Sequence, residues 1–320
     1  MSAAIPLTVI GGYLGAGKTT LLNHVLTHAG GQRIAVIVND FGSINIDAEL
    51  VASRDADTLN LANGCICCSI SMGFAEALQQ LASRSPPPDH VIIEASGVSD
   101  PVKVGHFAGM APYRLDGIVV LADAESVRTR AADKYVGGSV LRQLRGADLI
   151  VLNKVDLVSE SERIEIEAWL RKYAPEARIA VGRHGRLPLA LLVGLHGPGA
   201  ASEIAHGRGH DHDHGHEYAT CSFECDGPID EAVFRAVIAA WPKDVLRAKG
   251  FVHLRGDPVH RHLFQLVGRR WSLDRDRPWN SEAPRTRLVA IGLSSDFHGA
   301  GLFQSFVGQF TPTPATEVNA

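Results

Sequence analysis

Residues 12–19 read G-Y-L-G-A-G-K-T, a complete G-x-x-x-x-G-K-T pattern. Glycines let backbone N–H groups converge on phosphate oxygens without a clash from a Cβ atom, and the helix after such a loop points its positive N-terminal end at the anion. The lysine of the pattern reaches the β- and γ-phosphates of a nucleoside triphosphate, and the neighbouring hydroxyl holds Mg²⁺. The sequence therefore predicts a triphosphate site formed by Gly12, Gly15, Ala16, Gly17, Lys18, Thr19 and Thr20.

An N-K-x-D pattern at residues 153–156 predicts which base the nucleotide carries. The Asp156 carboxylate can accept hydrogen bonds from the N1–H and the exocyclic amine of guanine, and adenine lacks this pair of donors. Asn153 is expected to hydrogen-bond the base and neighbouring loops, and Lys154 to pack over the ring. The pattern therefore favours GTP.

Two acidic residues are candidates for holding Mg²⁺ beside this nucleotide. Asp47 lies in the polar segment 39–47, where a nucleotide-sensing switch is expected, and an ordinary surface turn is the alternative. Glu94 belongs to the apolar run 90–97, which ends in Gly97, whose N–H can approach the γ-phosphate. The predicted Mg²⁺ ligands are thus Thr19, Asp47 and Glu94, and the predicted catalytic residues are Lys18 and Glu94.

Three of the five cysteines lie close together, at Cys65, Cys67 and Cys68. Cysteines this near in sequence do not easily bridge each other, and thiols stay reduced in the cytoplasm, so a disulfide framework is not expected. Three thiolates favour Zn²⁺ or a similar ion over Mg²⁺ and leave a fourth tetrahedral position open, through which an ion can be handed on. Buried structural cysteines and a redox-active thiol pair are the alternatives.

A histidine-rich segment at 206–216 is the other group of potential metal ligands. It has too little apolar content to pack, so we expect a mobile linker between two domains. Imidazoles and carboxylates at this density bind divalent transition metals weakly and exchangeably, and a solvated tether without a metal is the alternative. The candidate ligands are His210, His212, His214 and His216.

Apolar runs and helical patterns indicate the elements that must position these residues. Continuous apolar runs are typical of strands buried on both faces of a parallel sheet. Their alternation with amphipathic helices predicts an α/β fold of the P-loop NTPase type, with a mainly parallel sheet, over residues 1–193. The expected strands are 7–10, 33–38, 90–97, 115–123, 147–152 and 177–181, and the expected helices are 20–26, 72–83, 160–173 and 187–192.

The composition shifts at Gly194, so residues 194–217 form the predicted linker and 218–320 a smaller α+β domain. Cys221, Phe223 and Cys225 fall on one face of a strand, and the two cysteines lie about 13 Å apart, too far to share an ion without a bend. We expect them to be core residues. The remaining expectations are a helix at 229–240, strands near 250–254, 262–267 and 287–291, a last helix around 297–310, and strand-packing or surface roles for His253, His260 and His262.

Charge and hydropathy bound the partners of the chain. The formal net charge of −4 and the absence of a long basic block predict no nucleic-acid partner. The apolar runs are far shorter than a membrane span, and no basic segment precedes the first of them, so neither a membrane nor export is expected. These features favour a cytoplasmic protein.

Taken in order, the motifs resemble the CobW family of GTP-dependent metallochaperones, relatives of the nickel-delivery GTPases of hydrogenase and urease maturation. The resemblance extends over nearly the whole chain, through G-G-Y-L-G-A-G-K-T-T, N-D-F-G-S-I-N-I-D, N-G-C-I-C-C, E-A-S-G-V-S-D-P, N-K-V-D, the histidine-rich segment, R-A-K-G and D-R-P-W. It implies slow GTP hydrolysis, Zn²⁺ or Co²⁺ on the three cysteines, and release of the ion to a client metalloprotein when the nucleotide changes. A nucleotide-linked homo-oligomer is a further expectation. One departure concerns residues 38–43, which read V-N-D-F-G-S where many members have a glutamate-rich switch, so only Asp40 remains as an acid there.

Two other functions remain open. In one, the protein is a metal buffer or sensor for which GTP is a structural ligand. In the other, it is an assembly factor for a cobalt-dependent pathway or for nitrile hydratase. The chaperone function predicts coupling: if the cysteine segment follows the switch and leads into the strand that ends at Glu94, GTP and metal should favour each other's binding.

Overall fold

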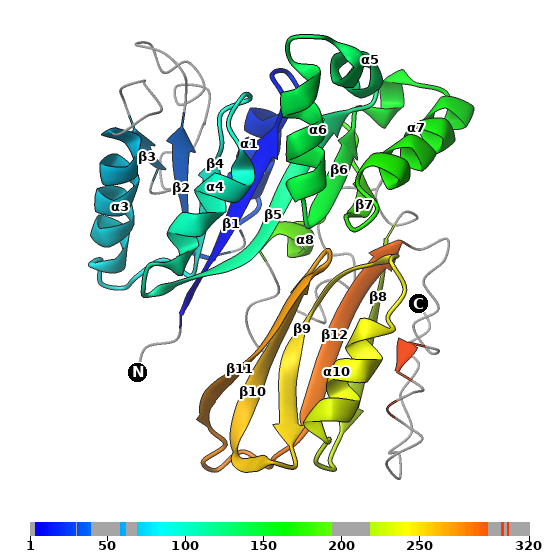
Figure 1. Cartoon of the computed structure of the whole chain (residues 1–320). Coiled ribbons are helices and arrows are strands. Elements are labelled where there is room, and N and C mark those ends of the chain that lie inside the picture. Colours follow the sequence, from blue (N-terminus) through cyan, green and yellow to red (C-terminus); the bar gives the residue numbers. More distant parts are fainter. Residues whose placement is uncertain are drawn as a thin grey trace. The chain divides into compact units, whose positions relative to one another are not determined.

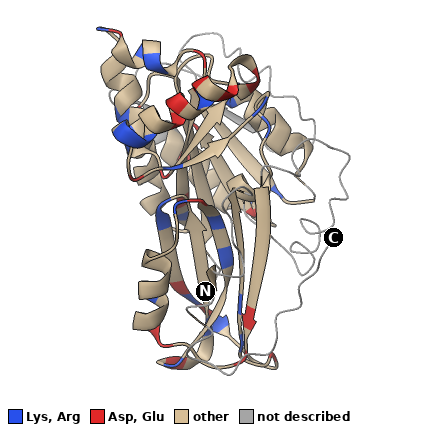
Figure 2. Cartoon of the chain, turned by 90° about the vertical axis from the view of Figure 1, so that its right-hand side faces the viewer, with Lys and Arg blue, Asp and Glu red and all other residues tan. Residues whose placement is uncertain are grey.

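The computed structural model describes residues 4–29, 31–39, 58–61, 69–193, 218–293, 302–303 and 306 (Figure 1). The chain divides into two compact units, an N-terminal unit of residues 1–193 and a C-terminal unit of residues 194–320. Among the described residues, no helix is long and apolar enough to cross a membrane. Lys and Arg are interspersed with Asp and Glu on the face shown in Figure 2.

The N-terminal unit is built on a seven-stranded sheet of order β3-β2-β4-β1-β5-β6-β7, in which all neighbouring strands are parallel. Every residue of β4 and β6 is buried, as expected for strands covered on both faces. The predicted parallel sheet is confirmed. The strands are β1 (Ile5–Gly12), β2 (Ile34–Asn39), β3 (Thr58–Leu61), β4 (His90–Glu94), β5 (Tyr113–Asp123), β6 (Leu149–Asn153) and β7 (Arg178–Val181).

Helices flank this sheet (Figure 1). The predicted helix 160–173 is confirmed. Ser159 caps it and forms a reciprocal capping box with Glu162. The predicted helix 72–83 begins three residues earlier, at Ser69. The helices are α1 (Lys18–Thr27), α3 (Ser69–Ala82), α4 (Pro101–Gly105), α5 (Val127–Ala132), α6 (Gly137–Gly146), α7 (Glu160–Tyr173) and α8 (Ala190–Val193), with 3-10 turns η1 (His106–Gly109) and η2 (Val155–Leu157).

A single apolar cluster holds one face of the sheet to its helices. Val9 and Ile93 from the central strands pack in this cluster with Phe74 of α3, Leu144 of α6 and Leu170 of α7, and all five side chains are buried. Burying apolar surface in this way stabilises the folded state by about 25 cal/mol per Å² of surface removed from water. The core therefore fixes the strand ends from which the candidate site is built.

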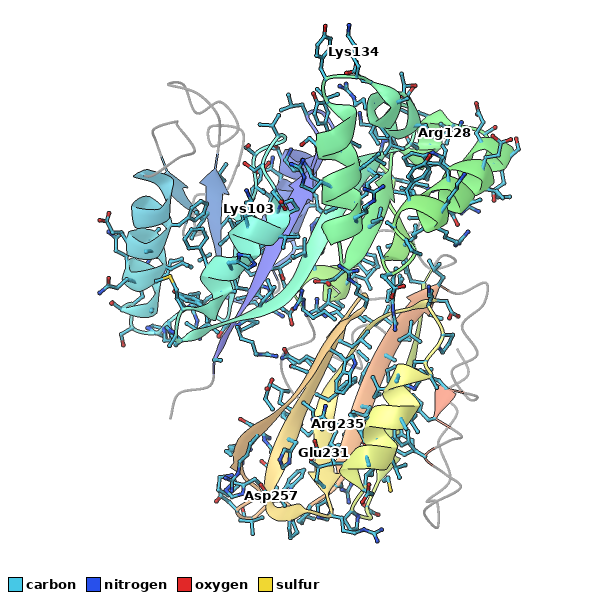
Figure 3. All side chains as sticks on the ribbon, in the orientation of Figure 1. Lys103, Arg128, Lys134, Glu231, Arg235 and Asp257 are labelled. Carbon is cyan, nitrogen blue, oxygen red and sulfur yellow. The ribbon has the colours of Figure 1, made fainter. Side chains whose placement is uncertain are left out.

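The C-terminal unit contains a five-stranded antiparallel sheet of order β11-β10-β9-β12-β8, on which helix α10 (Glu231–Ala239) packs. Glu231 and Arg235 form an ion pair along the exposed side of this helix (Figure 3). The predicted α+β class is confirmed, although strand β11 was not foreseen, and the predicted last helix lies mostly outside the described residues. The strands are β8 (Tyr218–Cys225), β9 (Val245–Leu254), β10 (Asp257–Val267), β11 (Arg270–Pro278) and β12 (Thr286–Leu293).

Among the described residues of this unit, Cys221 packs against the apolar core as expected, and His253, His260 and His262 lie in strands. Cys221, Phe223 and Cys225 are half-buried, and Ser222 and Glu224 between them are exposed. Burial raises the pKa of Cys221 to about 12 and also raises the pKa of Cys225, so both remain neutral thiols at physiological pH. His253 and His262 are buried strand residues, and half-buried His260 bonds to Asp257.

Candidate nucleotide site and the segments that leave the same sheet edge

The loop between β1 and α1 has the backbone geometry of a phosphate cradle. Gly12, Gly15 and Gly17 have φ angles of 133°, 79° and 99°, in the region that favours glycine. A Cβ atom built on Gly15 would meet nothing within 4 Å, so the loop faces open space at this point. Residues 12–19 are called the P-loop below.

The start of α1 fits an anion. Gly17 occupies the N-cap position, where it has no side chain to bond the first N–H groups, and the first turn contains no acidic residue. These N–H groups and the helix dipole therefore favour a negative ligand. Lys18, 8% exposed, donates from Nζ to the carbonyl oxygen of Gly12 at 3.1 Å, so its ammonium group is held within the loop.

Asn153, at the end of β6, joins the two nucleotide motifs. Its side chain is 1% exposed; Nδ2 donates to the carbonyl oxygen of Ala16 at 2.9 Å, and Oδ1 accepts from the N–H of Gly185 at 3.0 Å. Both ends of the amide are therefore engaged with neighbouring loops, as the sequence suggested. The direct contact of Asn153 with a base stays a prediction.

The other two residues of N-K-x-D follow β6 at the same end of the sheet. Lys154 has a left-handed backbone (φ 63°), and its ammonium group pairs with Asp123 at the end of β5, at 2.9 Å. Asp156 lies in η2, and its Oδ2 is 3.4 Å from Nδ1 of His184. An exposed imidazole thus already lies beside the carboxylate that is expected to select guanine.

The turn at 182–186 was not predicted as part of the site. His184 and Gly185 have φ angles of 52° and 70°, and the backbones of Arg183 and Arg186 form an isolated antiparallel β-bridge. A Cβ on Gly185 would come within 2.9 Å of Thr20, so the turn packs against the start of α1. The sequence signal that could have indicated it is a His-Gly pair soon after strand β7, since two successive positive φ angles favour such residues in tight turns.

Glu94 and Gly97 lie beside the P-loop. Glu94, 2% exposed, ends β4, where it pairs with Ile10 of β1 on one side and with Val38 of β2 on the other. A Cβ on Gly97 would lie 2.6 Å from the side chain of Leu14 and 2.8 Å from its backbone nitrogen. Only glycine permits this approach, so the loop after β4 rests directly on the P-loop.

Gln143 of α6 is a second residue that the sequence did not indicate. Its Oε1 accepts from the N–H of Gly12 at 3.0 Å, and its Nε2 donates to the carbonyl oxygen of Gly97 at 2.9 Å. No local pattern marks such a glutamine, because its partners are 131 and 46 positions away along the chain.

Several predicted ligands lie outside the described residues: Asp47, the three cysteines Cys65, Cys67 and Cys68, and the four linker histidines. The described residues next to them show where their segments begin. Asn39 at the end of β2 pairs with Leu61 at the end of β3, and both strands run parallel to β4 and β1. Within the described part of the chain, no three His, Cys, Asp or Glu side chains are arranged to hold a metal ion.

Comparison with known proteins places this geometry in a family. Residues 6–181 match the CobW/HypB/UreG nucleotide-binding domain, and residues 218–306 match the cobalamin synthesis protein cobW C-terminal domain. The chain is 36% identical to a zinc chaperone CobW from Sinorhizobium sp, over 90% of this chain and 93% of that protein. It is 32% identical to the zinc chaperone YjiA of Escherichia coli (strain K12), over 90% of this chain and 94% of that protein.

Among solved structures, the Zn(II)-bound YjiA GTPase from E. coli aligns over 96% of this chain and 99% of that chain, with 26% identity and a TM-score of 0.41. The family model over residues 6–181 and the two sequence relatives suffice for the assignment. The chain belongs to the CobW/HypB/UreG family, as the order of its motifs predicted.

Proposed function

We propose that this protein is a GTP-hydrolysing metallochaperone, which binds Zn²⁺ or a similar transition ion at Cys65, Cys67 and Cys68 and passes it to a client metalloprotein when the nucleotide changes. Two relatives named zinc chaperones support this function. So does a 30% identical protein of Dictyostelium discoideum, named zinc-regulated GTPase metalloprotein activator 1, which matches 82% of this chain. Cobalt remains an alternative ion, because it accepts the same ligands.

The observation that carries the proposal is the order of four neighbouring strands, β3-β2-β4-β1. Because these strands are parallel, their C-terminal residues Leu61, Asn39, Glu94 and Gly12 lie along one edge of the sheet, called here the carboxyl edge. At about 4.8 Å per strand, the ends of β3 and β1 are roughly 14 Å apart. The segment with the cysteines therefore starts beside the segment with Asp47, and both start close to the P-loop.

The chemistry proposed at the carboxyl edge follows from the residues there. The ammonium group of Lys18 would leave its bond with Gly12 and neutralise charge on the β- and γ-phosphates. Thr19, Glu94 and Asp47 would hold Mg²⁺, which when bound neutralises the charge that develops on the transferred phosphoryl group. The burial of Glu94 fits this ion, because a carboxylate in a low-dielectric setting attracts a divalent cation strongly.

Metal release would follow from coupling between the two sites. A γ-phosphate contact that repositions residues 94–97 would move the end of β4. Only strand β2 separates β4 from β3, after which the cysteine segment follows, so the movement has a short path to the metal ligands. Coupling between two ligands is reciprocal, so GTP would tighten zinc binding by the same factor as zinc tightens GTP binding. Hydrolysis would then loosen the ion.

The test is a competition titration of Zn²⁺ and Co²⁺ against a chromophoric chelator. The full chain is measured with Mg²⁺ and either a non-hydrolysable GTP analogue or GDP. We expect at least about tenfold tighter zinc binding with the analogue, equivalent to about 1.4 kcal/mol. The Cys65, Cys67, Cys68→Ala triple variant should lose this site. Cys225→Ser is the matched control, because it removes one half-buried thiol from the other unit.

Hydrolysis is followed in parallel by phosphate release, which Lys18→Ala should abolish. Zinc affinity that ignores the nucleotide, or that survives in the triple variant, would favour the buffer function. A further variant with His210, His212, His214 and His216 changed to Asn would then show whether the linker holds the metal.

A further inference from the structure

Gln143 connects the two loops that are expected to contact phosphate. It is 2% exposed, and its amide bonds at 3.0 Å to the N–H of Gly12 and at 2.9 Å to the carbonyl oxygen of Gly97. Because an N–H must meet the amide oxygen and a carbonyl must meet the amide NH₂, only one orientation of the side chain satisfies both partners. The amide therefore fixes the distance between the two loops as well as their directions.

A simple packing role does not account for a glutamine here. The other buried side chains of α6 that face the core, Val140 and Leu144, are apolar. Burying an amide carries a penalty of about 1–3 kcal/mol unless its bonds are made, whereas an apolar side chain of this size would carry none. The position is thus suited to holding two backbone groups and not to filling space.

Two further contacts tie the same helix and loops together. Ser139, one turn before Gln143 on α6, donates to the carbonyl oxygen of Val98 at 3.4 Å, so two successive carbonyls after β4 are held from α6. Gly97 rests on the backbone of Leu14, as described above. The loop after β4 is consequently held between α6 and the P-loop.

We propose that Gln143 is a positioning residue for the γ-phosphate contact, acting by locking the loop of Gly97 to the P-loop. This inference rests on the proposed GTP hydrolysis and names how that site is held. Since a peptide unit is planar, fixing the Gly97 carbonyl restricts the orientation of the backbone that precedes and follows it. The lock matters most when a γ-phosphate is present, because GDP has no group that reaches Gly97.

The test compares Gln143→Met with Arg142→Ala in the full chain. Methionine has a similar volume and makes neither bond, and a cavity of about 20 Å³ beside Gln143, lined also by Leu14 and Arg130, gives its thioether room. Arg142 is exposed and neighbours Gln143 on α6, so its removal controls for changes to the helix. The affinities for a GTP analogue and for GDP, kcat and KM are measured for each protein.

We expect Gln143→Met to lower kcat by about 10- to 100-fold. The ratio of its affinities for the GTP analogue and for GDP should fall at least about fivefold. Arg142→Ala should leave both kcat and this ratio unchanged. Equal losses for the two nucleotides, or an unchanged kcat, would overturn the inference. If the wild type itself neither bound nor hydrolysed GTP, the proposed function would fail instead, so the two failures are distinguishable.

A measurement on the wild type keeps the inference testable if the variant does not fold. Hydrogen exchange at the Gly12 amide reports its bond to Gln143. We expect slow exchange that slows further, by at least about threefold, when the GTP analogue replaces GDP. Fast exchange at Gly12, or exchange that is the same with both nucleotides, would contradict the lock.

Discussion

Gly17 of the P-loop lies so close to the side chain of Asn153 in the N-K-x-D motif that only glycine fits at position 17. A Cβ atom built on Gly17 would be 2.4 Å from Nδ2 of Asn153, the same atom that donates to the carbonyl oxygen of Ala16. The last glycine of the P-loop thus serves two purposes. It supplies a positive φ angle for the turn, and it makes room for the residue that links the P-loop to the N-K-x-D motif.

Gly17→Ala should therefore destabilise the protein more than Gly15→Ala. Both glycines have positive φ angles, so both variants incur about 1–2 kcal/mol of backbone strain. Only at residue 17 does the new methyl group also meet Asn153, which should add about 1–3 kcal/mol. Denaturant unfolding of the nucleotide-free protein measures the difference. In a double-mutant cycle, Asn153→Ala should relieve the added part, and strictly additive free energies would contradict the steric explanation.

Asp156→Asn should change the preferred base. The carboxylate can accept from N1–H and the exocyclic amine of guanine, whereas an asparagine amide offers a donor that suits the 2-carbonyl of xanthine. We expect GTP affinity to fall by about 100-fold, since two charge-assisted bonds are lost, and XTP affinity to rise. Equilibrium binding of both nucleotides is the measurement. Glu165→Gln, which removes an exposed acid of α7, is the control. A variant that still prefers GTP would contradict the assignment of Asp156 as the residue that selects guanine.

Gly250→Ala should destabilise the C-terminal unit. A Cβ on Gly250 would lie 2.0 Å from the carbonyl oxygen of Arg287 and 2.8 Å from Cα of Leu288, so β9 and β12 would have to separate. We expect a loss of about 2–4 kcal/mol. Gly256 makes a matched control, because its added Cβ would meet nothing within 4 Å. Calorimetric midpoints compare the two alanine variants, and equal midpoints would mean that the strands adjust without cost.

Acid should destabilise the C-terminal unit through His253. Burial lowers the pKa of His253 below its ordinary value, so the unfolded chain binds a proton at a higher pH than the folded chain does. Stability is therefore fully present above the unfolded pKa, about 6.5, and is lost as the pH falls from there through the folded pKa. Burial lowers the pKa of His262 in the same direction, and the nearby Asp257 carboxylate opposes this shift.

The measurement is the unfolding midpoint between pH 7.5 and 5 for the wild type and for His253→Phe. Phenylalanine keeps the ring contact with Trp279 but binds no proton, so its pH dependence should be shallower. His28→Asn, at the exposed position that follows α1, should behave as the wild type does. If the phenylalanine variant is as acid-sensitive as the wild type, His253 is not the titrating group.

The sequence predicted the parts of the structure whose signal is local. The bounds predicted for helix α7, 160–173, agree with the structure, in which Ser159 and Glu162 form a capping box at its start. Helices α5 and α6 went unpredicted, since their N-caps are Ser126 and Val136, neither of which makes a side-chain cap bond. Strand β11 was missed because its sequence, R-W-S-L-D-R-D-R-P, has only two large apolar side chains, Trp271 and Leu273, before its proline, and so lacks the sustained alternation that marked β8 as a strand.

The residues of the candidate site also fall into those with a local sequence signal and those without one. The glycines, Lys18 and Asp156 belong to contiguous motifs whose chemistry depends on residue type and spacing, so they could be named from the sequence. Gln143 bonds to the backbone groups of Gly12 and Gly97, and the turn at His184 contacts the side chains of Asn153 and Asp156, all far away along the chain. Which distant carbonyl or N–H lies opposite an amide is decided by helix and strand packing, and no local pattern records that.

Two neutral amides, Asn153 and Gln143, hold the loops around the phosphate position. Uncharged groups neither titrate near neutral pH nor attract counterions, so their bonds should be insensitive to buffer composition. High salt should consequently weaken attraction between Lys18 and a triphosphate while leaving the shape of the cradle unchanged. Under varying ionic strength and acidity, such a framework would keep the pocket ready between successive nucleotides.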